Sequence, residues 1–132
     1  MREEEGFTLI ELMLVVVIIG ALAAMVVPRL VGRSEDALKA AAKGDIASIS
    51  SALELFELEN GRFPRTSEGL KSLMVKPSWA TKWNGPYLRK TPKDSWGSEY
   101  KYVCPGKAGR DFDLSSMGPD HKEGGGDDIV GW

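Results

Sequence analysis

The chain of 132 residues has only one cysteine, Cys104, and only one histidine, His121. One cysteine excludes a disulfide within the chain, although small domains outside the cytoplasm commonly depend on disulfides or on a metal. Seventeen basic residues stand against 19 acidic ones, for a formal net charge of −2, and the basic residues form no cluster. The composition therefore argues against nucleic-acid binding and favours a metal as the stabilising element of a small domain.

One long apolar run, GFTLIELMLVVVIIGALAAMVVP, occupies residues 6–28. A helix of about 21 such residues would be roughly 31 Å long, close to the thickness of the hydrocarbon core of a bilayer. The run is long for a secretory signal peptide, although the ALA at residues 21–23 leaves signal cleavage as a minority alternative. A buried core helix is a second alternative, but a small domain rarely hides a helix that is apolar on every face. The run therefore predicts a transmembrane helix.

Glu11 is the one acidic residue of this run. An ionised carboxylate inside a span costs about 2.5 to 3.5 kcal/mol, so Glu11 either snorkels to the headgroups or has a positively charged partner. The span itself contains no cation, and the preceding MREEEG has only Arg2. A partner must therefore come from another molecule or from a newly made amino terminus.

These residues resemble the N-terminal signal of type IV pilins and type II secretion pseudopilins, in which a polar leader ending in Gly precedes FTLIEL and a long apolar helix. The resemblance implies that residues 1–6 are a leader, that a prepilin peptidase cleaves between Gly6 and Phe7, and that the new amine of Phe7 is methylated. In the family, the glutamate at the position of Glu11 is thought to pair with the amine of a neighbouring subunit. Glu11 is therefore the expected assembly residue.

Two signals disagree on orientation. Arg2 precedes the span, whereas four basic residues follow it at positions 29, 33, 39 and 43, so the positive-inside rule alone predicts a cytoplasmic C-terminal part. The resemblance implies a single-pass protein of the bacterial inner membrane with its C-terminal part in the periplasm. We follow the cleavage motif because it is the more specific signal, and we expect a leader at 1–6, a transmembrane and assembly helix at 7–30 and a periplasmic pilin-like domain at 31–132.

Apolar residues continue beyond Pro28 at spacings of three and four, which predicts that the helix continues with one amphipathic stripe. The stripe consists of Leu38, Ala42, Ile46, Ile49, Leu53 and Phe56. It is short and rich in Ala, so we expect it to cover a globular domain rather than to form a coiled-coil seam. Pro28 and Gly32 should kink or loosen the helix, and Asn60 with Gly61 should end it.

The remaining chain predicts small elements. Thr66 or Ser67 can cap a short helix in SEGLKSLMVK, which Pro77 would end. A turn-rich loop carries Trp79, Trp83, Tyr87 and Trp96, which pack the loop onto a core or, alternatively, form a binding platform. The segments SEYKYVCP and RDFDLSSMG, separated by GKAG, predict an antiparallel hairpin. The expected fold is α+β: a long N-terminal helix, half transmembrane and half amphipathic, packed on a small antiparallel sheet.

The C-terminal segment gathers Asp120, Asp127 and Asp128 in a glycine-rich loop. Calcium takes six to eight oxygen ligands and tolerates irregular geometry, so acidic residues on a pliable loop suit it, with backbone carbonyls completing the shell. The spacing of the acidic residues excludes an EF-hand. On spacing alone, a calcium site and an exposed acidic tail remain equally open.

The order DSWG, Y, PG, DFDLSSMGPD and DDI, close to a terminal Trp, resembles the G-type major pseudopilins of type II secretion systems over essentially the whole chain. The resemblance implies a type IV pilin-like fold with calcium where pilins have a C-terminal disulfide. It assigns Asp120, Asp127 and Asp128 as acidic positions of the calcium loop and Met117 as the donor of a backbone carbonyl. His121 is expected to be exposed, because calcium prefers oxygen.

The resemblance also implies the function, a structural subunit that polymerises into a periplasmic pseudopilus and drives export of folded proteins through the outer membrane. Its expected partners are further copies of itself, minor pseudopilins, the prepilin peptidase, the inner-membrane assembly platform and the outer-membrane secretin. The major subunit of a surface type IV pilus is the alternative, since it shares the N-terminal motif. The lack of a cysteine pair and the GPD and DDI motifs favour the pseudopilin.

An enzyme is the remote alternative, namely a membrane-anchored hydrolase with Cys104 as nucleophile and His121 as base, or with the aspartates as acid and base. Cys104 lies in a predicted strand beside Pro105, and no oxyanion loop or residue that would orient a base is recognisable. A lone cysteine is usually a small core residue. We therefore expect a protein that is not an enzyme.

Overall fold

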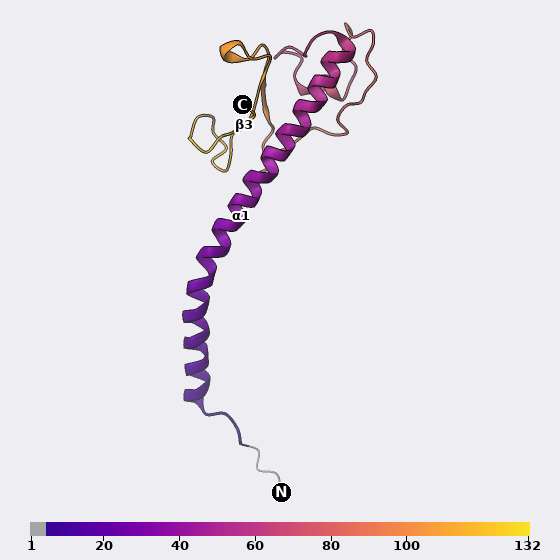
Figure 1. The fold of residues 1–132 in the computed structure, drawn as a ribbon. Coiled ribbons are helices and arrows are strands. Elements are labelled where there is room, and N and C mark those ends of the chain that lie inside the picture. Colours follow the sequence, from indigo (N-terminus) through magenta and orange to yellow (C-terminus); the bar gives the residue numbers. More distant parts are fainter. Residues whose placement is uncertain (1–4) are drawn as a thin grey trace. The chain divides into compact units, whose positions relative to one another are not determined.

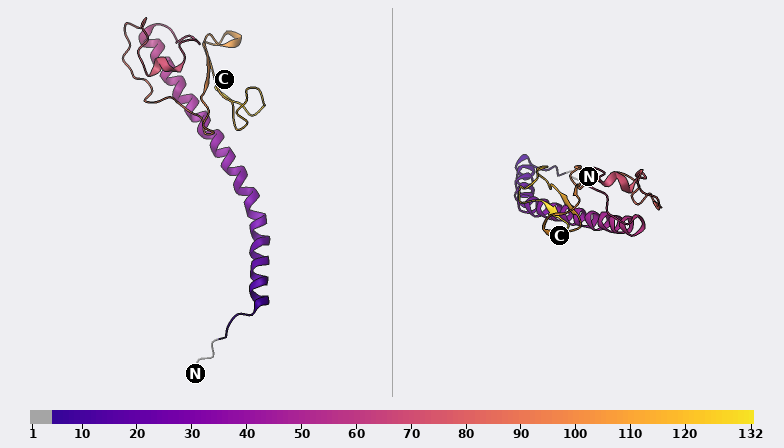
Figure 2. Two further views of the ribbon diagram at one scale, coloured as in Figure 1. Left: turned by 180° about the vertical axis from the view of Figure 1, so that it is seen from behind. Right: turned by 90° about the horizontal axis from the view of Figure 1, so that it is seen from above.

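The computed structural model describes residues 5–132, without the side chains of residues 29–31. Residues 1–4 of the predicted leader lie outside this range. The elements are the helix α1 (Leu9–Asn60), the 3-10 helices η1 (Leu70–Leu73) and η2 (Lys107–Gly109), and the strands β1 (Lys101–Val103), β2 (Asp113–Ser116) and β3 (Ile129–Val130) (Figures 1 and 2). The chain divides into two compact units, Met1–Asp36 and Ala37–Trp132, which we describe separately.

The first unit carries the N-terminal part of α1. Its large apolar side chains between residues 7 and 27 are all at least half exposed, up to 82% for Phe7. Within the described residues, α1 is the one helix long and apolar enough to cross a membrane. Pro28 lies inside the helix, so it does not end it. These properties are those expected of a transmembrane segment whose apolar surface is covered by lipid or by other helices.

The second unit is built around the amphipathic part of α1. Ala42, Ile46, Ile49, Leu53 and Phe56 are buried, whereas Leu38 at the start of the stripe is 36% exposed. The stripe packs against Leu73 and against buried side chains of the sheet and the chain leading into it, as the 3.6-residue period predicts. The sheet contributes Tyr102, Leu114 and Ile129 to this core, and Tyr100 directly precedes β1.

α1 ends where the sequence predicts. Gly61 adopts a left-handed conformation, with φ of 86°, and its N–H donates to the Glu57 carbonyl at 2.7 Å. Glycine takes this conformation without steric cost, and it commonly follows the last helical residue.

The sheet has three antiparallel strands in the order β1-β2-β3. The predicted hairpin of β1 and β2 is confirmed, with Tyr102 opposite Leu114. β3 was not predicted; it pairs with the end of β2 so that Ile129 lies opposite Ser116. This pairing returns the C-terminal loop to the end of β2, and the sheet lies beside the part of α1 that belongs to the second unit (Figures 1 and 2).

The helix predicted in SEGLKSLMVK is wrong in length, type and start. Only η1 forms, it follows Gly69 with φ of 63°, and no side chain caps it. Thr66 is engaged elsewhere: its hydroxyl donates to the Cys104 carbonyl at 3.0 Å and accepts the Cys104 N–H at 2.9 Å. A contact across 38 residues thus takes the hydroxyl that the local pattern assigned to a cap.

The loop aromatics Trp79, Trp83, Tyr87 and Trp96 pack against the core, which supports the packing interpretation. Trp79 meets Phe56 edge to face at 5.7 Å between ring centroids, and the Arg62 guanidinium lies 3.5 Å from the centre of a Trp79 ring. Arg62 also makes two 2.9 Å hydrogen bonds to the Glu68 carboxylate. The two hydrogen bonds of the Arg62 guanidinium therefore join the end of α1 to the following turn.

We expect the Arg62–Glu68 pair to stabilise the fold in a pH-dependent way. Hydrogen bonding to Arg62 lowers the pKa of Glu68 from its ordinary value of 4.5 to about 2. A lowered pKa contributes stability that is present above pH 4.5 and is lost as pH falls toward about 2. In Glu68→Gln, the midpoint of urea unfolding should therefore fall less steeply than in the unchanged chain as the pH is lowered from 4.5 toward 2. Glu54→Gln, on the exposed face of α1, should leave this fall unchanged. An unchanged pH dependence in Glu68→Gln would contradict a stabilising role of the Arg62–Glu68 pair.

Candidate functional site

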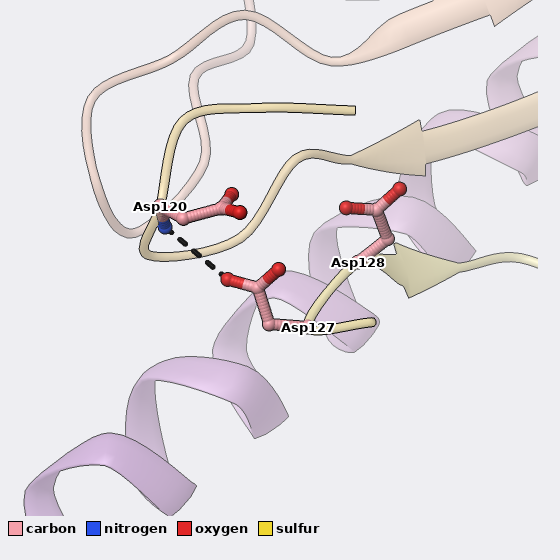
Figure 3. Close-up of side chains that lie close together, drawn as sticks. All are labelled: Asp120, Asp127 and Asp128. Atoms are coloured by element: carbon pink, nitrogen blue, oxygen red, sulfur yellow. Dashed lines mark hydrogen bonds between the residues drawn. The ribbon is translucent and has the colours of Figure 1, made fainter. Parts of the chain in front are cut away.

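Three carboxylates meet between the end of β2 and the start of β3 (Figure 3). Asp120, Asp127 and Asp128 each offer an oxygen, and these oxygens lie within 4.8 Å of one another. Asp127 and Asp128 directly precede β3, and Asp120 follows β2 by four residues. The antiparallel pairing of β2 with β3 is therefore what closes the loop and brings the three side chains together.

Glycine is needed where the loop closes. A Cβ on Gly118, whose φ is 71°, would overlap the backbone carbonyl oxygen of Asp127. A Cβ on Gly125 would overlap a carboxylate oxygen of Asp120 and would lie 2.7 Å from Oδ1 of Asp127. The backbone thus approaches the carboxylates too closely for any larger residue.

Each aspartate has one oxygen held by a backbone amide. The Asp120 N–H donates to Asp127 Oδ2 at 3.2 Å, the Gly124 N–H to Asp128 Oδ2 at 2.9 Å, and the Lys122 N–H to Asp120 Oδ1 at 2.8 Å. Oδ1 of Asp127 and Oδ1 of Asp128 are buried and have no hydrogen-bond partner among the described residues. Buried polar atoms are normally satisfied, and carboxylate oxygens are hard ligands, so these two atoms fit a divalent cation such as calcium.

A neighbouring ion pair ties the loop to the sheet. Glu123 pairs with Lys101 of β1, and the hydrogen bond from Lys101 lowers the pKa of Glu123. Glu123 lies beside Gly124, whose amide binds Asp128. Glu123 stays ionised in this pair, and the positive charge of Lys101 offsets its negative charge beside the three aspartates.

The other two predicted residues of this loop, Met117 and His121, are not among the three clustered carboxylates. Met117 is half-buried and follows the last residue of β2, so its carbonyl shares a peptide group with the Gly118 N–H. His121 is exposed, as expected, and its Nδ1 lies 2.7 Å from the Ser98 hydroxyl.

Sequence reasoning missed two buried polar residues behind the loop, Asp94 and Ser116. Asp94 begins the DSWG turn, and its carboxylate accepts the N–H groups of Trp96 and Ser98. Ser116 ends β2 and donates its hydroxyl to Asp94 at 2.6 Å. The Asp-x-x-Gly spacing predicts a turn capped by the aspartate, but the partner 22 residues away leaves no local signal.

The N-terminal signal residues lie at the start of α1. Gly6 and Phe7 precede the helix and are exposed. Glu11 accepts the Thr8 N–H at 2.7 Å and the Thr8 hydroxyl at 2.9 Å, and its own N–H donates to that hydroxyl at 3.3 Å. This is a capping box, legible in TLIE but missed, and it gives the carboxylate a local partner within the subunit.

The residues of the enzyme alternative are not joined. The half-buried Cys104 thiol donates to the Asp111 carbonyl at 3.3 Å, and His121 contacts Ser98. No hydrogen bond of the described residues links Cys104 with His121, so they form no nucleophile–base pair here.

Comparisons with known proteins agree with both halves of this description. The sequence model "Prokaryotic N-terminal methylation motif" matches residues 1–27, and "Type II secretion system (T2SS), protein G" matches residues 29–132. Among curated proteins, the type II secretion system core protein G of Pseudomonas aeruginosa is 48% identical over 99% of this chain and 96% of its own length. The core protein G of Vibrio cholerae is 43% identical over 100% of this chain and 94% of its own length.

A solved structure is similar as well. The crystal structure of the major pseudopilin from the type 2 secretion system of enterohaemorrhagic Escherichia coli matches with a TM-score of 0.70 and 33% identity, covering 80% of this chain and 95% of that one. The fold and the signal together define a pilin-like protein with a methylation-type N-terminus. The chain belongs to the type II secretion system protein G family, the major pseudopilins, which confirms the family, the fold and the structural class of function predicted from the sequence.

Proposed function

We propose that the chain, as a pseudopilin, polymerises into a periplasmic pseudopilus and thereby drives export of folded proteins through the outer membrane. The observation that carries this proposal is the match of one chain to both the N-terminal methylation motif and protein G, over 1–27 and 29–132. The exposed apolar part of α1 suits both the subunit in the membrane and the subunit in the filament, since it can lie in lipid and later pack against other copies. A surface type IV pilin is not favoured, because the match outside the shared motif is to protein G.

The signal residues would act in sequence. Cleavage between Gly6 and Phe7 creates an amine one residue from Thr8, and methylation leaves that amine positively charged. Glu11, whose carboxylate is held by Thr8 within the subunit, would then pair with the amine of a neighbouring copy. The carboxylate costs free energy inside the membrane until it is paired, so pairing favours assembly.

Calcium would be bound by the C-terminal loop. The support is the pair of buried, unpartnered oxygens on Asp127 and Asp128 beside Asp120. Bound there, the ion would neutralise three carboxylates that otherwise repel one another and would hold β3 against β2. It would thus supply the cross-link that a chain with one cysteine lacks.

The proposal places the protein in the inner membrane with residues 31–132 in the periplasm. Its partners would be further copies, minor pseudopilins, the prepilin peptidase, the assembly platform and the secretin. No catalytic residue is assigned, in keeping with a family of structural subunits.

A gene deletion in the bacterium that encodes the chain tests this function. Proteins exported by the type II system should disappear from the medium and accumulate in the periplasm, and a plasmid copy should restore export. Export that persists while a long surface fibre disappears would instead identify a type IV pilin.

Replacing Cys104 with Ser should leave export unchanged, because the thiol serves only as a weak donor to Asp111. Complementation of the deletion strain measures this, with protein abundance in the membrane as the folding control. Lost export at normal abundance would revive the hydrolase.

A further inference from the structure

The buried carboxylate of Asp94 is the centre of a hydrogen-bond network behind the C-terminal loop. Asp94 is 6% exposed. Its Oδ1 accepts the N–H groups of Trp96 at 3.1 Å and Ser98 at 2.8 Å, and its Oδ2 accepts the Ser116 hydroxyl at 2.6 Å. The carboxylate is therefore satisfied by protein groups and is not itself a candidate ligand.

Ser116 connects the Asp94 carboxylate to the C-terminal loop by two hydrogen bonds. Its side chain is 0% exposed, and its one hydroxyl hydrogen is donated to Asp94. The hydroxyl oxygen is then available only as an acceptor, and it accepts the Gly118 N–H at 3.1 Å. Asp94 thus determines, through Ser116, the direction of the Gly118 amide.

The orientation of that amide fixes a carbonyl. The Gly118 N–H and the Met117 carbonyl belong to one planar peptide group, and the cis peptides of the described chain lie elsewhere, at Gly85–Pro86 and Cys104–Pro105. In a trans peptide the N–H and the C=O point in opposite directions. With the N–H held toward Ser116, the Met117 carbonyl is aimed away from Ser116, and a rotated peptide would break the bond to the buried hydroxyl.

The same turn holds the loop at a second point. The Ser98 hydroxyl lies 2.7 Å from Nδ1 of His121, which directly follows Asp120, and the Ser98 N–H is held by Asp94. The turn beginning at Asp94 therefore contacts the loop at residue 116 and at residue 121, on either side of Met117 and Asp120.

We propose that Asp94 and Ser116 are positioning residues of the metal centre, which hold the Met117 carbonyl in its ligating direction without touching the ion. This inference rests on the proposed calcium site, with the Met117 carbonyl as one of its ligands. Residues that orient the ligands of a metal typically change its affinity by about 10- to 100-fold when they are replaced.

Calcium titration of the purified full-length chain in detergent micelles tests the proposal, with Ser116→Ala as the variant. We expect the calcium dissociation constant to rise about tenfold or more. Ser115→Ala is the matched control, since Ser115 is the preceding residue of β2 and its side chain points to the other face of the strand. Ser115 is half-buried, but its side chain takes no part in the hydrogen bonds from Asp94 through Ser116 to Gly118, so the dissociation constant of Ser115→Ala should stay within about twofold of the unchanged chain.

Luminescence lifetimes of bound terbium in light and heavy water distinguish positioning from mere support of the fold. Loss of the Met117 carbonyl should add a bound water in Ser116→Ala and none in Ser115→Ala. An unchanged affinity and water count in Ser116→Ala, even with a lower melting temperature in chelator, would overturn the proposal. A wild-type chain that binds no calcium would instead overturn the metal site itself, and this inference with it.

Two further measurements test the proposal if the Ser116→Ala chain does not fold. Asp94→Asn places an amide nitrogen where Asp94 accepts the Ser116 hydroxyl, and it should weaken calcium binding in the same direction. In the wild-type chain, the Gly118 amide should exchange slowly with and without calcium. Exchange at the rate of an open loop would show that Ser116 does not hold it.

Discussion

Excess chelator should lower the thermal midpoint of residues 37–132 by about 10 °C or more, relative to the chain at a calcium concentration of about a hundred dissociation constants. Such a ligand adds about 2.7 kcal/mol if it binds only the folded state, because folding is what brings Asp120 to Asp127 and Asp128. Circular dichroism of the full-length chain in detergent micelles measures the shift. Equal midpoints with calcium and with chelator would contradict a calcium site.

The variant Asp127→Asn makes this test sharper. The amide oxygen can still accept the Asp120 N–H, but one of three mutually repelling charges is removed. We therefore expect the midpoint in chelator to rise slightly and the calcium-dependent shift to be lost. Asp111→Asn, an exposed aspartate outside the cluster, should retain the full shift. A general effect of divalent ions on acidic groups would leave the shift of Asp127→Asn in place.

Replacing Glu11 with Leu should abolish filament assembly while leaving membrane insertion intact. Removal of a carboxylate from the span lowers its insertion cost by about 2.5 to 3.5 kcal/mol, so the subunit should remain in the membrane. Without the carboxylate, nothing pairs with the amine of Phe7 in a neighbouring copy. Electron microscopy of sheared filaments measures assembly, and mass spectrometry of the amino terminus confirms that cleavage after Gly6 still occurs.

Glu11→Gln separates this role from the capping box of Thr8 and Glu11. Glutamine serves at the third helical position of a capping box as glutamate does, so it keeps the cap but not the charge. Loss of filaments in both variants would support charge pairing between subunits. Normal filaments in Glu11→Gln would show that Glu11 acts by starting α1.

Much of the fold was predictable because its signals are local. The period of the stripe from Ala42 to Phe56 places these residues on one helix face, and Gly61 ends α1 by its own conformation. The hairpin of β1 and β2 follows from alternation on either side of GKAG. The helix expected after Thr66 failed because its cap is bound to Cys104, a competition invisible within a short window.

The candidate site was predicted only in part, for the same reason. Asp127 and Asp128 are adjacent in sequence, and the glycines around them show that the loop can fold back. Asp94 and Ser116 lie 22 residues apart and look like ordinary polar residues until the fold buries them together. Burial and partner choice are properties of contacts distant in sequence, and no spacing rule encodes them.

The sequence by itself determined the apolar span, the motif around Gly6 and Glu11, the amphipathic continuation of the helix and the family, because each depends on residue types at short spacings. Tertiary structure decided which oxygens of the acidic loop are buried without partners and which residues lie behind them. The physical reason is that β3, only two residues long, has too little local preference to form alone and exists through its pairing with β2.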